Sequence, residues 1–207
     1  RGALLKDRLQ LGDRLLLFSW PASNYLTYAE DIDDLAASLE QLNELLTELL
    51  RHVDAEQIVL MAHSLGSRGL VDALKSRDGG ERKFSEAVFV APDIRRDVFM
   101  DNLHMLQEKV SDITVYMSDN DRVLWLSATV NTSGRLGLAK EFDIDIDRIS
   151  VVDVTPAGTT DISGHMYHMF NPAVVEDLRS QMQAELDRDE ALAEASAASV
   201  AEKFDQP

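Results

Sequence analysis

One serine stands where a predicted strand meets a predicted helix. Ser64 lies in the pentapeptide AHSLG (62–66), after the apolar run 57–63 and before an amphipathic stretch that continues to about Ser76. A catalytic serine is often held on such a strained turn between a strand and a helix, which exposes the hydroxyl above the sheet. Gly is usual at both flanks, and Ala62 is the mildest departure from that pattern. The spacing therefore indicates Ser64 as a nucleophile.

A serine nucleophile needs a general base. In folds that hold the serine on such a turn between a strand and a helix, the chain order is nucleophile, acid and then base. The sequence has five histidines, and two of them, His165 and His168, lie in the loop after the last predicted strand. Gly164 gives the backbone freedom to place His165, which is therefore the predicted base, and His168 is predicted to be structural. Of the remaining three, His63 is assigned to packing, His52 to the end of a helix and His104 to a helix surface.

The acid is expected just beyond the second strand after the nucleophile strand. There the apolar run 112–117 ends in Ser-Asp-Asn-Asp (118–121), from which a carboxylate can reach the histidine loop. Asp121 is the predicted acid and Asp119 is the near competitor. Asp93, one strand earlier, is a third choice because some hydrolases place the acid there. Turn and helix-cap chemistry is the alternative role for all three residues.

Metal and thiol chemistry have less support than a serine mechanism. The chain contains no Cys, so it can form no disulfide, thiolate nucleophile or Cys-ligated metal site. His165 and His168 have a spacing that could bind a metal beside Asp161, but no further ligand is near in the sequence. We expect no metal and no organic cofactor.

Alternating apolar strands and helices predict one α/β domain with a parallel sheet covered on both faces. Sites in such sheets form at the carboxyl ends of the strands, and every candidate above lies near such an end. The predicted strands are 14–20, 57–63, 84–91, 112–117 and 149–154. The predicted helices are 1–11, 28–52, 66–76, 97–110, 123–130 and 172–186.

Composition sets limits on partners and on domain organisation. The 207 residues are 45% apolar and carry 37 acidic against 20 basic side chains, a formal net charge of −17. Such a surface repels phosphate backbones, so nucleic acid is not an expected partner. No apolar run approaches the roughly 20 residues of a membrane span. The hydrolase core is assigned to residues 1–187, and an acidic tail rich in Ala and Glu to 188–207.

Several short motifs together resemble one bacterial family of α/β-hydrolase-fold proteins similar to esterases and lipases, long catalogued as a domain of unknown function. The resemblance covers about residues 14–180 and implies a triad of Ser64, Asp121 and His165. It also implies that the N–H of Leu65 is one oxyanion-hole donor, and that the substrates are carboxylic esters with short acyl chains. The motifs are FSWP (18–21), AHSLG (62–66), APDI (91–94), Tyr116-x-Ser118-x-x-Asp121-x-x-Leu124-x-x-Ser127, Arg135-x-Gly137 and Gly164-His165-x-Tyr167.

One family feature is not found in this sequence. Members carry a strand ending in His-Gly-Tyr before the region that begins here, and that turn supplies the second oxyanion donor. Its absence would leave a hole or a raw edge in the sheet. The chain opens with Arg1 rather than Met, and we expect an N-terminally incomplete α/β-hydrolase fold, either the remainder of a longer chain or a damaged enzyme. A leader further upstream would leave both a cytoplasmic and a periplasmic location open.

The predicted function is hydrolysis of small carboxylic esters through an acyl-enzyme. The sequence does not separate an esterase from a lipase, thioesterase, acyltransferase or peptidase, although the short links after Ser64 disfavour a large lid. A catalytically inactive scaffold that binds a partner is the alternative from a different class. The oligomeric state cannot be predicted.

Overall fold

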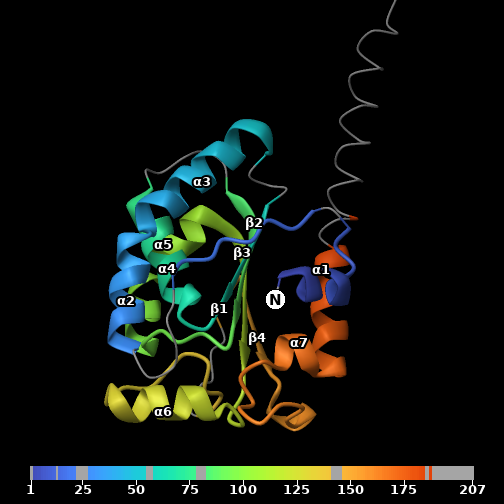
Figure 1. The fold of residues 1–207 in the computed structure, drawn as a ribbon. Coiled ribbons are helices and arrows are strands. Elements are labelled where there is room, and N and C mark those ends of the chain that lie inside the picture. The colour runs from blue at the N-terminus through green and yellow to red at the C-terminus, as the bar shows by residue number, and fades with distance from the viewer. Residues whose placement is uncertain are drawn as a thin grey trace, which may run out of the picture.

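The fold is known from a computed structural model, which describes residues 2–12, 14–21, 28–54, 58–77, 83–140, 146–184 and 187. Four parallel strands form its centre in the order β1-β2-β3-β4 (Figure 1). Parallel pairing follows from the helical crossover between successive strands, as the alternating sequence pattern predicts. The strands are β1 (Val59–His63), β2 (Phe84–Val90), β3 (Val110–Met117) and β4 (Ile149–Asp153).

Helices cover both faces of the sheet, and a further helix lies at its carboxyl edge (Figure 1). One face carries α2 (Tyr28–Ala37), α3 (Leu39–His52), α4 (Gly66–Ser76) and α5 (Arg96–Lys109). The other carries α1 (Gly2–Leu9), the short α7 (Tyr167–Phe170) and the helical residues 172–184. The helix at the carboxyl edge is α6 (Arg122–Val130), and a 3₁₀ turn, η2 (Thr155–Ala157), follows β4.

Alternation of side chains along the strands builds two hydrophobic cores. All seven residues of β2 are buried, as expected of a central strand with helices on both sides. Ala87 and Phe89 face the cluster with α4 and α5, whereas Val88 and Val90 face the cluster with Leu9 and the helix 172–184. Burial of both faces fixes the register, because a shift by one residue would exchange the two sets of side chains.

The register brings the carboxyl ends of the strands together. His63 of β1 lies opposite Val90 of β2, and Val90 lies opposite Tyr116 of β3. Met117 of β3 in turn lies opposite Asp153 of β4. The loops that follow β1, β2, β3 and β4 therefore emerge along one edge of the sheet, where ligand sites of open α/β folds form.

The strand predicted at residues 14–20 is wrong. The segment is irregular, and the side chains of Leu16 and Leu17 are 56% and 58% exposed. A strand requires a neighbouring backbone at about 4.8 Å, but a cavity separates this segment from β1, since both line its walls. An apolar run rich in Leu therefore lies near the sheet without pairing with it.

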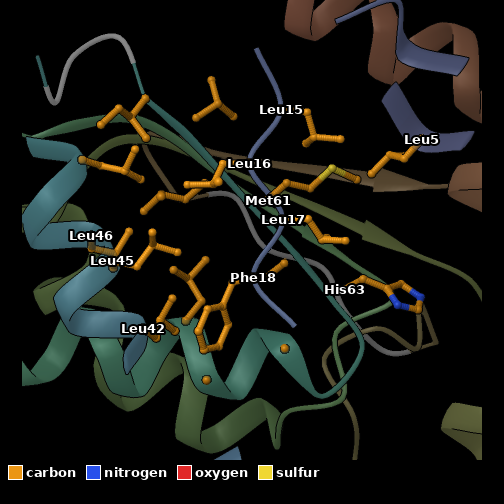
Figure 2. A pocket seen from close by; sticks show the side chains of 18 of the residues that line it. Leu5, Leu15, Leu16, Leu17, Phe18, Leu42, Leu45, Leu46, Met61 and His63 are labelled. Atoms are coloured by element: carbon orange, nitrogen blue, oxygen red, sulfur yellow. The ribbon is translucent and has the colours of Figure 1, made fainter. Parts of the chain in front are cut away.

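That cavity lies along the open edge of β1 and has a volume of about 740 Å³ (Figure 2). Its walls come mainly from residues 14–18, four leucines of α3 and all five residues of β1. The N–H of Ser85 donates to the carbonyl of Ile58, and the N–H of Ser64 donates to the carbonyl of Val90. The backbone groups of the even-numbered residues on the β1 side therefore bond to β2. Because backbone groups alternate along a strand, the odd-numbered residues of β1 present theirs to the cavity. Among the described residues, β1 is the end strand of the sheet, and the cavity lies on its unpaired side.

The long helix predicted over residues 28–52 is two helices, which meet at Ser38. The Ser38 hydroxyl donates to the carbonyl of Asp34 at 2.8 Å, and the backbone of Ser38, with φ −94° and ψ 0°, departs from ideal helical angles. Such bonding of Ser to the preceding turn bends or interrupts helices. Within the described parts of the chain, no helix combines the length and the apolar character that crossing a membrane requires. The predicted tail 188–207 lies outside the described residues.

Candidate active site

Ser64 follows β1 directly and has the strained backbone that the sequence predicts. Its φ is +55°, in a region that residues other than Gly seldom adopt. The conformation is held from two sides, because the N–H of Ser64 donates to the Val90 carbonyl and the N–H of Asp93 donates to the Ser64 carbonyl, each at 3.0 Å. The side chain is half-buried at the carboxyl edge of the sheet. The turn thus presents the hydroxyl above the strands.

The helix after Ser64 points its amino terminus at this turn. Leu65 is the N-cap of α4, with φ −61° and no side chain that caps the helix. The first N–H groups of a helix have no acceptor within the helix and carry a partial positive charge. The N–H of Leu65 is therefore suited to stabilise negative charge that develops beside the Ser64 oxygen.

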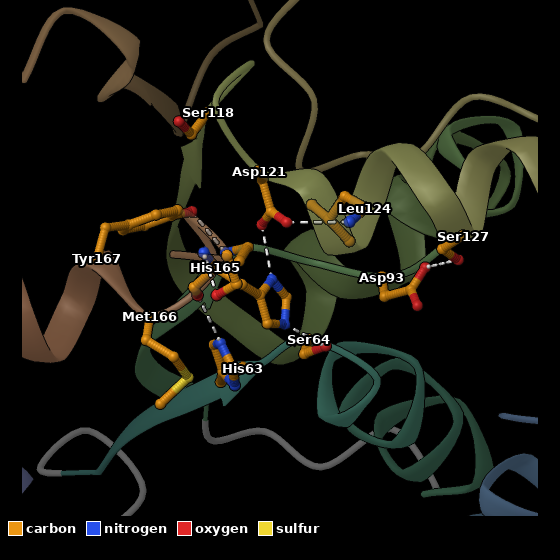
Figure 3. A network of polar contacts seen from close by, with 12 residues as sticks. His63, Ser64, Asp93, Ser118, Asp121, Leu124, Ser127, His165, Met166 and Tyr167 are labelled. Carbon is orange, nitrogen blue, oxygen red and sulfur yellow. Dashed lines mark hydrogen bonds and ion pairs between the residues drawn. The ribbon is translucent and has the colours of Figure 1, made fainter. Parts of the chain in front are cut away.

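His165 lies between Ser64 and Asp121 and contacts both (Figure 3). Its Nε2 is 2.8 Å from the Ser64 Oγ, and its Nδ1 is 2.6 Å from the Asp121 Oδ2. The imidazole is buried, with 2% of the residue exposed. The three residues come from the turns after β1, β3 and β4, so the common edge of these strands brings them together.

Asp121 is fixed by the start of α6, for which it is the N-cap. Its Oδ1 accepts a hydrogen bond from the N–H of Leu124 at 2.9 Å, which leaves Oδ2 for His165. The residue is fully buried. The sequence offered helix capping as an alternative role for Asp121. Because a carboxylate has two oxygens, Asp121 caps the helix and contacts His165 at the same time.

The other two candidate acids lie away from the imidazole. The Oδ1 of Asp119 accepts from the N–H of Lys140 at 2.8 Å. Asp93 instead pairs with the guanidinium of Arg135 at 3.1 Å and accepts from the Ser127 hydroxyl at 2.8 Å. Of the three candidates that the sequence offers, the structure brings Asp121 to His165.

This geometry is suited to moving a proton from the serine. When Nδ1–H donates to Asp121, Nε2 is free to accept the proton of Ser64 as its oxygen attacks an electrophile. The Asp121 carboxylate then faces the imidazolium that forms. Such a relay turns a weakly nucleophilic hydroxyl into a reactive one without a metal in the reacting set.

A turn organised by Asp161 holds His165 in place. The carboxylate of Asp161 accepts from the hydroxyl and the N–H of Ser163 and from the N–H of Met166. Partial burial raises the pKa of Asp161, but these hydrogen bonds outweigh it and the net pKa lies below its usual value. Gly164, within this turn, has φ +65°, and a Cβ there would overlap the carbonyl of Asn120. The predicted need for glycine before His165 is thus confirmed.

His63 contributes more than the packing predicted for it. Its Nε2 lies 3.2 Å from the carbonyl oxygen of His165, and the centroids of the two rings are 4.7 Å apart. The buried His168 also packs against His63, with the two ring centroids 4.3 Å apart. The structural role predicted for His168 agrees with this stacking. The sequence pattern gave no signal for the contact between His63 and His165, since the two lie 102 positions apart.

Tyr167 joins two of the loops around the site, although its motif suggested no role. Its hydroxyl donates to the carbonyl of Tyr116 and accepts from the N–H of Ala91, each at 2.8 Å. Burial, followed by the charge of Asp121, raises the pKa of Tyr167, so the side chain stays a neutral phenol. The ends of β2 and β3 are thereby tied to the segment that carries His165.

The family comparison agrees with this fold. The family described as "Alpha/beta hydrolase of unknown function (DUF900)" matches residues 1–183. The chain belongs to this family. The matched part of this alpha/beta hydrolase includes Ser64, Asp121 and His165, and the resemblance inferred from its motifs is confirmed. Searches of curated proteins and of solved structures gave no match.

The alpha/beta hydrolase shows no arrangement of three His, Cys, Asp or Glu side chains fit to hold a metal ion among its described residues. His165 and His168, which have a metal-like spacing in the sequence, point in different directions. The ring of His165 engages Ser64 and Asp121, and that of His168 stacks on His63. The pair therefore does not act as one set of ligands in this conformation.

Proposed function

We propose that this alpha/beta hydrolase is a serine hydrolase that cleaves carboxylic esters through Ser64, His165 and Asp121. The observation that carries the proposal is the continuous contact from the Ser64 hydroxyl to Nε2 and from Nδ1 to Asp121, at 2.8 and 2.6 Å. These distances lie within the range required for general-base catalysis. The positive φ of Ser64 and the helix amino terminus beside it support the same chemistry.

The reaction proceeds in two acyl-transfer steps. His165 accepts the hydroxyl proton as Ser64 Oγ bonds to the ester carbonyl carbon, and the Leu65 N–H stabilises the resulting oxyanion. The tetrahedral intermediate expels the alcohol, which takes the proton from His165, and leaves an acyl-serine. A water molecule then repeats the sequence and releases the carboxylic acid, so that Ser64 regains its proton.

Short-chain esters are the proposed substrates, as the family resemblance implies. The experiment is a chain-length series of p-nitrophenyl esters, from acetate to palmitate, together with a fluorophosphonate that labels activated serines. We expect hydrolysis of acetate and butyrate, and attachment of the label to Ser64 by peptide mapping. A folded protein that neither cleaves the esters nor takes up the label would contradict the proposal and favour an inactive scaffold.

The glycine before the general base offers a further prediction. Gly164→Ala should lower kcat on the order of 10²-fold, because the added Cβ displaces the turn that carries His165. Gly158→Ala is the matched control, since Gly158 lies in the same loop with φ +73° but has open space where its Cβ would be. Both variants should lose on the order of 1–3 kcal/mol of unfolding free energy from the positive φ. Equal kcat values for the two variants would contradict the proposed role of the turn.

A further inference from the structure

A buried ion pair lies behind the proposed active site and makes no contact with the reacting groups. The Nε of Arg135 is 3.1 Å from the Oδ1 of Asp93, and the two side chains are 5% and 3% exposed. Their contact is electrostatic rather than a well-directed hydrogen bond. Burying two charges costs more than an apolar pair of similar volume would. Stability alone therefore does not account for a buried ion pair of Asp93 and Arg135 at this place.

Ser127 of α6 joins the pair to the helix that carries Asp121. The Ser127 hydroxyl donates to the Asp93 Oδ1 at 2.8 Å, and a terminal nitrogen of Arg135 donates to the Ser127 carbonyl at 3.5 Å. Asp121 caps the first turn of the same helix. Figure 3 shows Asp93 and Ser127 side by side, with Asp121 at the start of α6. The position of α6, and with it that of Asp121, thus depends on contacts to Asp93.

The backbone of Asp93 reaches the nucleophile directly. Its N–H donates to the carbonyl of Ser64 at 3.0 Å, on the peptide that follows the strained φ of the turn. Asp93 therefore binds Ser64 through its main chain and α6 through its side chain. The loop after β2 thus connects the nucleophile to the helix of the acid.

A second segment holds Arg135 against this loop. The N–H of Leu136 donates to the carbonyl of Ile94 at 2.9 Å, and the N–H of Gly137 donates to the carbonyl of Pro92 at 3.0 Å. A Cβ on Gly137 would come within 2.8 Å of the Pro92 nitrogen, so the close approach requires glycine. The guanidinium is thus placed by main-chain bonds on both sides of Asp93.

We propose that Asp93 and Arg135 form a positioning pair that sets Ser64 relative to Asp121 and His165. The inference rests on the proposed function, because it assigns the pair to the geometry of that site. Neither residue touches the reacting atoms. Proton transfer through the 2.8 Å contact between Ser64 and His165 is sensitive to displacement, and a shift of about 1 Å can cost on the order of 10²-fold in rate.

The test compares Asp93→Asn, Arg135→Met and the double variant by p-nitrophenyl butyrate kinetics and urea unfolding. Each single variant should lower kcat on the order of 10- to 100-fold with KM little changed, because the acid and the nucleophile lose their alignment. Each should also be destabilised by the charge left buried. In the double variant neither member of the pair is charged, so this variant should regain stability but not kcat.

A purely structural pair gives the opposite pattern. If kcat per folded molecule stays at the wild-type value in the single variants, or returns together with stability in the double variant, the inference is wrong. Thr114→Val is the matched control, because it removes the 2.6 Å bond between the buried Thr114 and Glu86 within the sheet. It should lower stability and leave kcat unchanged.

Amide exchange tests the link without any substrate. In Arg135→Met and in the double variant, the N–H of residue 93 should exchange faster than in the wild type after correction for intrinsic exchange rates. In Thr114→Val it should not do so once the global loss of stability is subtracted. Unchanged protection of this amide in both charge variants would overturn the inference. A wild-type protein that cleaves no ester would refute the proposed function instead, while the exchange result would still report on the pair.

Discussion

Ser64→Ala should lower kcat for p-nitrophenyl butyrate by about 10⁶-fold, the loss typical of a missing nucleophile in a serine hydrolase. The substitution removes the atom that His165 contacts at 2.8 Å and leaves no hydroxyl for the acyl-enzyme. The fold should be retained, since the Ser64 N–H still donates to Val90 and Ala fits the same small space. Stopped assays at high enzyme concentration and intact-mass measurement after fluorophosphonate treatment give the two readouts.

The matched control for the nucleophile is Ser76→Ala, at the other end of α4. The hydroxyl of Ser76 donates to the Ala73 carbonyl within that helix, far along it from the turn at Ser64. Its loss should change neither kcat nor the mass added by the label. Ester cleavage that persists at the wild-type rate in purified Ser64→Ala would remove the basis of the proposed mechanism.

Asp121→Asn should lower kcat by about 10⁴-fold, the effect seen when the acid of such a relay becomes neutral. An amide at this place no longer faces the imidazolium with a negative charge, and its NH₂ group favours the wrong tautomer of His165. The capping bond to the N–H of Leu124 can remain, because Asn caps helices as well as Asp does. Steady-state kinetics together with thermal unfolding should therefore show a large loss of rate and a small loss of stability.

Asp119→Asn is the control for the acid, since Asp119 lies in the same turn and was the nearest competitor in the sequence. Its carboxylate bonds the N–H of Lys140 rather than the imidazole. We expect kcat within a few-fold of the wild type. A loss in Asp119→Asn that equals the loss in Asp121→Asn would show that the turn as a whole, and not one carboxylate, supports His165.

Local patterns were sufficient for most of the fold. Largely apolar runs identify β2 and β3, which are buried for most of their length, and the helices predicted at 66–76 and 123–130 match α4 and α6 within one or two positions. The same reasoning was wrong for residues 14–20, where the apolar run lies beside a cavity instead of a strand. An apolar run indicates contact with other apolar groups, but strand pairing also needs a second backbone within bonding distance.

The sequence alone determined the candidate nucleophile, the base and the class of fold. Small residues around Ser64 at a strand–helix junction and a glycine before His165 are local requirements of backbone geometry, so they can be read without coordinates. Only the tertiary structure decided which of three aspartates meets His165, that His63 contacts its carbonyl, and that Asp93 turns to Arg135. Contacts between residues 44 or 101 positions apart depend on how the strands align, and no local pattern encodes that alignment.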